Sequence, residues 1–332
     1  MKISNKKFAS EDYLNQIAEI YNWYLRGNDL VVTSSGTTGE AKKIHLKREH
    51  VLHSAQLSVD FFQLKENSKI LLNLPLDKIG GIMLAIRAFV AGATIFPVDP
   101  ARAFMAELPR EETYTFASMV ANQVDGNLPY LNQIEKILIG GGPISSDLEN
   151  RLQAIESKVW HSYASTETIS HVALRQIRPN ASEVYQGLPG LSFSTAKGGN
   201  LVIDAPELGL LQLETKDQVK LLSAHSFIWL GRMDNVVLSG GLKLYPEKLE
   251  AKLKLDAPYF LDKEEDSSLG ERLIIVIEEG LPIPKLIKDI KSQLKGSERP
   301  KAIYVAKQFR YTSNGKLRRK ETRNGAEFLQ LI

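Results

Sequence analysis

The 332-residue sequence contains no cysteine, and its six histidines are scattered along the chain. The lack of cysteine excludes disulfides, thiolate catalysis and cysteine-ligated metals. The scattering of the few histidines argues against a structural zinc site. Long apolar runs are also missing. No stretch approaches the ~20 residues of a membrane-spanning helix, and the N-terminal segment lacks the apolar core of a signal peptide. We therefore expect a soluble cytoplasmic protein that does not insert into a membrane.

A strong net charge is absent as well. The 42 basic and 39 acidic residues leave a net charge of +3, which gives no reason to expect nucleic acid or an anionic membrane as a partner. Hydrophobic residues make up 43% of the chain, enough for a sizeable core, and the length suggests about two domains. The oligomeric state is not specified, and a homodimer stays open.

Apolar runs and helical patterns alternate through the first half of the chain. "KILLNLP", "ATIFPV", "TYTFAS", "KILIGGGPIS" and "KVWHSY" read as buried strands. Helices are predicted over residues 12–25, 47–63 and 145–156, and "GGIMLAIRAFVAG" predicts a buried helix that stops at Gly92. Such alternation predicts a parallel α/β sheet.

The pattern changes at Leu191, where "LSFSTA", "NLVIDA", "LLQLETK" and "SFIWLG" predict an antiparallel β unit. A second α/β stretch follows Gly231, with strands near residues 235–238, in "RLIIVIEE" and in "AIYVA", and helices near 246–254 and 283–295. We expect a large N-terminal α/β domain with an antiparallel β subdomain over residues 1–231. A small C-terminal α+β domain would follow over residues 232–332.

The loop in "VVTSSGTTGEAKKI" lies between two short predicted strands. Hydroxyl side chains, glycine backbone N–H groups and a lysine are the groups that hold phosphate oxygens. The spacing G-T-T-G-E-A-K does not fit the Walker pattern, so the sequence predicts a different phosphate loop, with a flexible polar turn as the alternative. Lys42 and Lys43 would point to opposite faces of a strand, and the spacing favours Lys42. The candidate residues are Thr33, Ser34, Ser35, Gly36, Thr37, Thr38, Gly39 and Lys42.

"WHSYASTETISH" places three candidate residues after a predicted strand. The aromatic face of Tyr163 can stack on a base, with Thr166 close by in the sequence. The carboxylate of Glu167 can hold a magnesium ion that bridges phosphates, although it could also be a plain surface carboxylate.

Two stretches in the second half carry further candidates. "GRMDNVVLSGG" puts Arg232 and Asp234 at the predicted domain junction, before a glycine pair. "YTSNGKLRRK" puts Lys316 in a glycine turn, where its charge could meet developing negative charge. The basic run around it could also be only a charged surface.

In this order, these stretches resemble the motifs of the adenylate-forming superfamily of acyl-CoA synthetases, firefly luciferases and peptide-synthetase adenylation domains. "TSSGTTGEAKK" resembles the phosphate loop, and "YASTET" resembles Y-G-x-T-E. "TKD" resembles T-G-D, whose aspartate, here Asp217, binds the ribose hydroxyls. "GRMDNVVLSGG" resembles the hinge motif. "NGKLRR" resembles G-K-x-x-R, which contains the catalytic lysine, here Lys316.

The resemblance implies a set of site residues and co-substrates. ATP, Mg²⁺ and coenzyme A would take part, with Lys316 and Glu167 in catalysis and Glu167 at the magnesium ion. The C-terminal domain would swing about a hinge at Asp234. Beyond the phosphate loop, ATP would meet Gly141, Gly142, Tyr163, Thr166, Asp217 and Arg232. Coenzyme A would meet Ser239, Gly240 and Gly241, and the acid pocket would contain Lys78, Gly81 and His161.

Within the superfamily, four stretches resemble the o-succinylbenzoate–CoA ligases of menaquinone biosynthesis, in a short form: "LPLDKIGGIMLAIRAFVAGA", "IGGGPIS", "YASTETISHVALRQI" and "RMDNVVLSGGLKLYPEKLE". This implies ATP-dependent joining of that acid to coenzyme A through an acyl-adenylate. Ligation of another aryl or acyl acid is one alternative. A degenerate, non-catalytic nucleotide-binding protein is another, against which Lys316, Glu167 and Arg232 together argue.

The sequence departs from the family pattern at several positions. Ala41 stands where proline is usual, Ala164 where glycine is usual, and Lys216 replaces the glycine of T-G-D. Lys78, beside Asp77, aligns with a histidine that many relatives use for acid positioning or thioester formation. The short forms manage without that imidazole, or the alignment slips by a residue.

Overall fold

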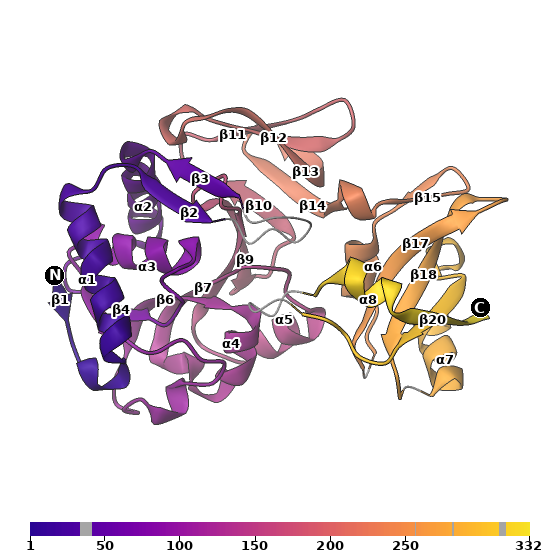
Figure 1. Cartoon of the computed structure of the whole chain (residues 1–332), viewed down its shortest axis with the longest axis horizontal. Coiled ribbons are helices and arrows are strands. Elements are labelled where there is room, and N and C mark those ends of the chain that lie inside the picture. The colour runs from indigo at the N-terminus through magenta and orange to yellow at the C-terminus, as the bar shows by residue number, and fades with distance from the viewer. Residues whose placement is uncertain (34–41, 256, 281, 312–316) are drawn as a thin grey trace.

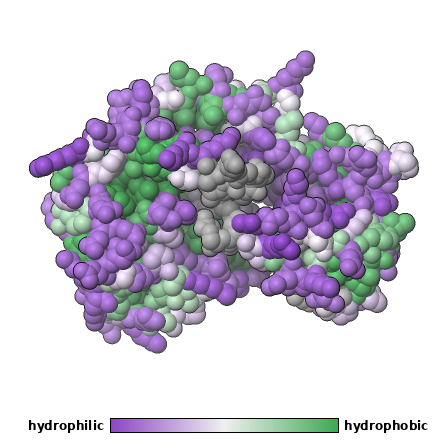
Figure 2. Space-filling view, in the orientation of Figure 1, coloured by the Kyte–Doolittle hydropathy of each residue, from purple (hydrophilic) through white to green (hydrophobic). Residues whose placement is uncertain are grey.

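The computed structural model describes residues 1–33, 42–255, 257–280, 282–311 and 317–332. Figure 1 shows a larger body, formed by the first part of the chain, beside a smaller one formed by the C-terminal part. Each contains its own sheet. Figure 2 shows that mostly hydrophilic side chains cover both bodies on this face, with hydrophobic residues in smaller areas. Among the described residues, no helix is long and apolar enough to cross a membrane.

The larger body is built on a sheet that has twelve strands among the described residues, in the order β1-β5-β4-β6-β7-β8-β9-β10-β14-β13-β12-β11. All pairings from β1 to β8 are parallel, which confirms the predicted parallel α/β sheet. In chain order the strands are β1 (Lys2–Ile3), β4 (Lys69–Leu72), β5 (Thr94–Pro97), β6 (Tyr114–Val120), β7 (Ile134–Gly140), β8 (Lys158–Ala164), β9 (His171–Arg178), β10 (Val184–Gly187), β11 (Ser192–Thr195), β12 (Asn200–Ala205), β13 (Leu210–Ser223) and β14 (Ser226–Arg232).

The antiparallel part begins earlier than the sequence indicates. Strands β9 and β10, which we did not predict, pair antiparallel before Leu191, and β11 to β14 then continue the same sheet. Strands β2 (Leu30–Thr33) and β3 (Lys43–Leu46) form a separate antiparallel ribbon on either side of the predicted phosphate loop. The ribbon confirms the two strands expected there.

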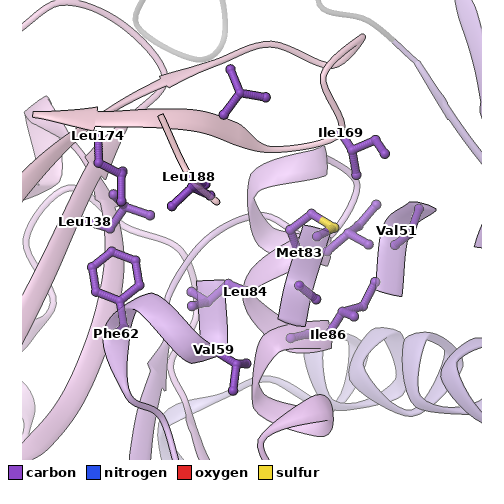
Figure 3. Packing of buried hydrophobic residues seen from close by; sticks show 14 of the residues in the cluster. Val51, Val59, Phe62, Met83, Leu84, Ile86, Leu138, Ile169, Leu174 and Leu188 are labelled. Carbon is purple, nitrogen blue, oxygen red and sulfur yellow. The ribbon is translucent and has the colours of Figure 1, made fainter. Parts of the chain in front are cut away.

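Helices cover both faces of the parallel strands. Buried side chains of α1 (Glu11–Arg26), α2 (Arg48–Phe62) and α3 (Ile79–Val90) pack with Leu138 of β7 in one core cluster. Figure 3 shows this packing between α2, α3 and the sheet. Side chains of α4 (Ala121–Gly126) and α5 (Ser146–Leu152) pack with Ile137 and Ile139 in a second cluster. The alternation along β7 follows from the two-residue period of a strand.

Local signals in the sequence explain how these helices begin and pack. Ser10 caps α1 by accepting a hydrogen bond from the backbone N–H of Tyr13, and Ser145 caps α5 in the same way. Helix α3 is apolar nearly all round and lies buried, as predicted. Gly81 lets it approach the preceding loop, because a Cβ there would lie 2.1 Å from the carbonyl oxygen of Pro75.

The smaller body contains the second sheet, in the order β16-β15-β18-β19-β20 with β17 paired to β18. Its strands are β15 (Val237–Ser239), β16 (Leu242–Leu244), β17 (Tyr259–Asp266), β18 (Gly270–Glu278), β19 (Ala302–Ala306) and β20 (Ala326–Leu331), and its helices are α6 (Pro246–Lys252), α7 (Ile283–Gln293) and α8 (Arg319–Asn324). Most of these elements match predicted ones, but β16, β17, β20 and α8 were not predicted.

The chain crosses from the first sheet to the second between the end of β14 and the start of β15, through a short 3-10 turn, η5 (Met233–Asn235). The domain boundary that we propose lies in this turn. Asn235 donates a hydrogen bond to Oε1 of Glu247 on α6, and Oε2 of Glu247 faces Gly231 and has no hydrogen-bond partner in the described part of the chain. A second contact joins the two bodies where the hydroxyl of Ser146 donates to the carbonyl of Ala251.

Candidate functional site

The candidate nucleotide site lies where strands β7 and β8 end, beside β13 and β14. Ligands of parallel α/β sheets bind at the carboxyl ends of the strands. Strand β7 ends at Gly140, so Gly141 and Gly142 follow its carboxyl end, and Tyr163 is the second-to-last residue of β8. The sheet therefore brings three of the predicted ATP-binding residues to one edge.

Tyr163 and Asp217 come from different motifs and are joined directly. The phenol of Tyr163 donates a 2.6 Å hydrogen bond to Oδ2 of Asp217. Burial, together with the negative charge of Asp217, raises the pKa of Tyr163 well above its usual range, so the phenol keeps its proton and acts as the donor. The ring of Tyr163 also packs edge-on against Phe227 and Tyr185.

Asp217 is held from two further sides. Its Oδ1 atom accepts a 3.1 Å hydrogen bond from the indole N–H of Trp229. Arg232 lies directly opposite on β14, with Nη1 3.9 Å from the same oxygen. Each carboxylate oxygen can accept more than one hydrogen bond, so the oxygens keep acceptor capacity for ribose hydroxyls. The two aromatic donors orient the carboxylate before any ligand arrives.

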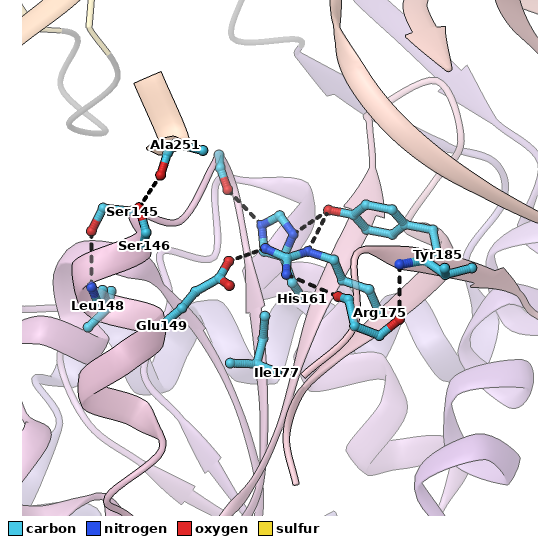
Figure 4. A network of polar contacts seen from close by, with 12 residues as sticks. Ser145, Ser146, Leu148, Glu149, His161, Arg175, Ile177, Tyr185 and Ala251 are labelled. Carbon is cyan, nitrogen blue, oxygen red and sulfur yellow. Dashed lines mark hydrogen bonds and ion pairs between the residues drawn. The ribbon is translucent and has the colours of Figure 1, made fainter. Parts of the chain in front are cut away.

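His161, two residues before Tyr163 on β8, belongs to a buried network (Figure 4). Its Nε2 atom lies 2.9 Å from the carbonyl oxygen of Gly142, which can only accept, so Nε2 carries the proton. Its Nδ1 atom then accepts from the hydroxyl of Tyr185 at 2.6 Å. Burial, assisted by the charge of Arg175, lowers the pKa of His161 to about 3. The imidazole is therefore neutral and ties the turn after β7 to the sheet.

The same network reaches α5. Arg175 donates from Nε to the hydroxyl of Tyr185 at 3.2 Å and forms an ion pair with Glu149 (Figure 4). His161 is thus part of a hydrogen-bond network that holds the turn of residues 141 and 142 in place. Its predicted role in the acid pocket stays a prediction.

Thr166 and Glu167 lie in the turn that joins β8 to β9. The side chain of Thr168 bridges this turn, because its hydroxyl donates to the carbonyl of Ser170 at 2.8 Å and accepts from the N–H of Ser165 at 2.9 Å. Glu167 is exposed at the same turn. A single exposed carboxylate fits a magnesium ion that takes its remaining ligands from phosphates and water. Among the described residues, no group of three acidic or histidine side chains could hold a metal by itself.

The other predicted residues fall in two places. Lys78 is the residue before α3, and its Nζ atom pairs with Asp77 at 2.9 Å. Gly81 lies inside α3, where its close packing on Pro75 gives it a structural reason to be glycine. In the smaller body, Ser239 ends β15, and Gly240 and Gly241 form the exposed β15–β16 turn. Both glycines have positive φ, of 55° and 81°, as such a two-residue turn requires.

Part of the predicted site lies outside the described residues. This holds for Ser34, Ser35, Gly36, Thr37, Thr38 and Gly39 of the phosphate loop and for Lys316. Thr33 and Lys42 lie at its two edges, at the end of β2 and just before β3. Close to Lys316 in sequence, Arg319 forms two hydrogen bonds with the carboxylate of Glu250, at 2.8 and 2.6 Å. This pair anchors the start of α8 to α6.

Sequence reasoning missed one buried charge. Arg87 on α3 is 2% exposed and donates to the hydroxyl of Ser170 and, at 3.4 Å, to Nδ1 of His171. Nε2 of His171 lies 3.0 Å from the hydroxyl of Ser58, which itself donates to a carbonyl, so Nε2 carries a proton. Burial, together with the charge of Arg87, lowers the pKa of His171 well below its usual value, so the ring is neutral and its Nδ1 accepts. Burial lowers the pKa of Arg87 to about 9. The only sequence signal was a lone arginine within an apolar helix.

No carboxylate among the described residues forms an ion pair with Arg87, and its Nε atom has no hydrogen-bond partner there. A buried cation without a counter-ion is costly. A buried, strongly perturbed charge next to a candidate site is a candidate functional group. Ser170 connects it to that site, because the turn of Glu167 ends at this residue.

A large α/β sheet with candidate nucleotide-site residues at its strand ends, followed by a smaller α+β unit, is the arrangement expected of an adenylate-forming protein. Residues 27–197 match the family described as AMP-binding enzyme, and the chain belongs to this family.

Curated relatives are less than 30% identical to this chain, over matches that cover most of it. A probable 2-succinylbenzoate–CoA ligase of Mycobacterium tuberculosis is 27% identical over 77% of this chain and 73% of its own length. The 2-succinylbenzoate–CoA ligase of Staphylococcus epidermidis is 26% identical over 92% and 71%.

Solved structures show the same fold. An acyl-CoA synthetase (AMP-forming)/AMP-acid ligase II-like protein from Dyadobacter fermentans is 28% identical, with a TM-score of 0.65 over 96% of this chain and 95% of that one. The o-succinylbenzoate CoA synthetase of Bacillus subtilis, in complex with its acyl-adenylate intermediate, has a TM-score of 0.79 at 20% identity. That match covers 90% of this chain and 70% of that one.

Proposed function

We propose that this protein is an ATP-dependent acid–CoA ligase that works through an acyl-adenylate, and that its acid is o-succinylbenzoate. The observation that carries the proposal is the contact network that joins Tyr163, Asp217 and Arg232. These residues come from three separate motifs, and the sheet places them beside one another at a strand edge. Membership of the AMP-binding family and the names of the curated relatives support the same reaction class.

The first half-reaction activates the acid. A carboxylate is a poor electrophile because its negative charge resists attack, and transfer to AMP gives it a good leaving group. One carboxylate oxygen attacks the α-phosphorus of ATP, and pyrophosphate leaves. The transition state gathers charge on phosphate oxygens, so the catalysis required is positioning plus positive charge. Lys316 and the loop of residues 33–42 would supply both.

The nucleotide would be held by residues of the strand edge. Asp217, oriented by Tyr163 and Trp229, would accept hydrogen bonds from the ribose hydroxyls. The turn of Gly141 and Gly142, supported by His161, would border the base. Glu167 would hold the magnesium ion that accompanies ATP, and this ion, when bound, neutralises phosphate charge.

The second half-reaction forms the thioester. The thiol of coenzyme A attacks the acyl carbon of the adenylate, AMP leaves, and the thiol proton passes to solvent. We propose that the smaller body rotates about Asp234 between the two half-reactions and that residues 239–241 then meet the pantetheine arm. A glycine turn without side chains suits such a close approach. This is a gated reaction with two arrangements of the domains.

The buried charge of Arg87 is an argument for an acid substrate that carries a second negative group. o-Succinylbenzoate carries two carboxylates, of which only one becomes the thioester. The other would provide the counter-ion that Arg87 lacks among the described residues. Benzoate, acetate and fatty acids have no second carboxylate and would leave the buried cation unpaired.

The test is pyrophosphate release and thioester formation with ATP, Mg²⁺, coenzyme A and a panel of o-succinylbenzoate, benzoate, acetate and a long-chain fatty acid. We expect thioester fastest with o-succinylbenzoate, and pyrophosphate release in a first turnover without coenzyme A. A preference for acetate or the fatty acid would refute the proposed substrate. If no acid released pyrophosphate although ATP binds, the protein would be a non-catalytic nucleotide-binding member of the family.

A further inference from the structure

Lys216 stands where the superfamily motif has glycine, and the structure gives this departure a specific contact. The Nζ atom of Lys216 lies 3.4 Å from both carboxylate oxygens of Asp234. Lys216 belongs to β13 of the large sheet, whereas Asp234 lies in η5, between the two sheets. A glycine at position 216 has no side chain and could not make this contact.

Asp234 is shared with a second cation. Nη2 of Arg232 lies 3.3 Å from Oδ2 of Asp234, and Nη1 of Arg232 lies 3.9 Å from Oδ1 of Asp217. The four side chains form a row of alternating charge, from Lys216 through Asp234 and Arg232 to Asp217. Asp217 in turn is oriented by Tyr163 and Trp229. The carboxylate of Asp234, which lies between the two sheets, therefore contacts cations on both β13 and β14.

We propose that Lys216 is a positioning residue that holds Asp234 against the large sheet and so favours the present arrangement of the two bodies over a rotated one. The inference rests on the proposed function, because the rotation about Asp234 between two arrangements is part of that proposal. Rotation about Asp234 changes the backbone that carries its carboxylate. Lys216 stays with β13, so we expect the rotated arrangement to lose the two 3.4 Å contacts that the present one has.

The expected strength of this tether follows from its exposure. The side chains of Lys216 and Asp234 are 66% and 46% exposed. Exposed ion pairs contribute little, so removing this one should change the ratio of the two arrangements by about two- to fivefold. Salt should weaken the tether, because exposed pairs are screened. A bias of this size would favour one arrangement of the two bodies while both arrangements remain populated.

The experiment measures the arrangement directly. The chain has no cysteine, so Lys197→Cys on the larger body and Lys288→Cys on α7, both exposed, are unique sites for a donor and an acceptor dye. Single-molecule energy transfer then gives the populations of the present and rotated arrangements. Lys216→Met should reduce the ratio of present to rotated molecules about two- to fivefold, and Lys216→Arg, which keeps the charge, should restore it.

Two further arms test the partner and the charge. In an Asp234→Asn background, Lys216→Met should change the ratio no further, since the pair is already broken. Salt at 1 M, as an approximate working concentration, should bring the wild type to the ratio of Lys216→Met. If Lys216→Met and wild type give the same distribution at low salt, whether it has one peak or two, the proposal is wrong. Pyrophosphate release is measured separately, so a failure of the proposed reaction leaves this result readable.

Discussion

Tyr163 donates a 2.6 Å hydrogen bond to Asp217, although the two residues are 54 positions apart in the chain. One lies on β8, in the region of parallel pairing, and the other on β13, in the antiparallel region. The bond therefore joins the two parts of the large sheet at the edge where the nucleotide is expected. The indole N–H of Trp229 donates a hydrogen bond to the second oxygen of the Asp217 carboxylate. The residue expected to bind ribose is thus oriented by two aromatic side chains.

Replacing the tyrosine by phenylalanine removes one of these donors and keeps the ring. Tyr163→Phe should raise the KM for ATP about tenfold, as expected for a lost hydrogen bond to a charged group, while kcat changes little because the group does not touch the reacting atoms. Steady-state kinetics with varied ATP would check this. Trp229→Phe is the matched variant and should behave similarly. A fall in kcat with KM unchanged would contradict the orienting role.

Arg87→Met replaces an uncompensated buried cation by an apolar side chain of similar length. The free protein should be at least as stable as wild type, because no unpaired charge is left behind. The KM for o-succinylbenzoate should rise at least about tenfold, as for loss of a charged hydrogen bond, whereas the KM for benzoate should hardly change. Thermal unfolding and the acid panel measure the two effects.

The control for Arg87 is Arg175, which is 13% exposed at its side chain and paired with Glu149. Arg175→Met leaves the carboxylate of Glu149 without its cation and should cost about 1–3 kcal/mol, because the Glu149 side chain is only partly buried. Equal destabilisation by both variants would show that the two arginines have the same structural role.

Lys316→Ala tests the catalytic lysine expected from the sequence. Removing a charge aimed at the adenylation transition state should lower the rate of pyrophosphate release by about 10²–10³. Thioester formation from ready-made acyl-adenylate should be nearly spared. Lys320→Ala removes an exposed lysine of the same basic segment and should leave both half-reactions unchanged. Equal loss in both half-reactions of Lys316→Ala would show that the lysine is not specific to the first.

Glu247, which lies where the chain crosses between the two sheets, should make the stability of the folded protein depend on pH. Burial raises the pKa of its carboxyl group above the usual value. The folded protein therefore binds this proton more tightly than the unfolded chain does, and the free energy of unfolding falls as pH rises through the carboxyl range. Glu247→Gln has no proton to lose. Its melting temperature should exceed that of wild type by an amount that grows from pH 4 toward pH 8, as an approximate range.

Circular dichroism melts at several pH values would show this trend. Glu265→Gln, an exposed position on β17, is the control and should show no such growth. A constant difference between Glu247→Gln and wild type across the range would mean that the carboxyl group does not titrate differently in the folded state.

Much of the fold was readable because its signals are local. The apolar runs of β4 to β8 and the capped or fully apolar helices α1 and α3 depend on residues close in sequence, and the structure has them where they were expected. Strands β9 and β10 were missed for two reasons. Strand β9 pairs with β8, which precedes it across a short turn, but it joins a parallel sheet in the antiparallel sense, and the partner of β10, β14, lies farther along the chain. An antiparallel strand that joins a parallel sheet is decided by that pairing more than by its own composition.

The sequence by itself determined the kind of chemistry and the order of the motifs, because residue type and spacing specify which groups are available to phosphate, ribose and magnesium. It also marked Lys216 as a departure. Only the tertiary structure decided which of these groups meet. The register of β13 against β14 sets Arg232 opposite Asp217 and brings Lys216 to Asp234. The packing of α3 leaves Arg87 buried without a carboxylate among the described residues. Burial and pairing are long-range properties, and no local pattern contains them.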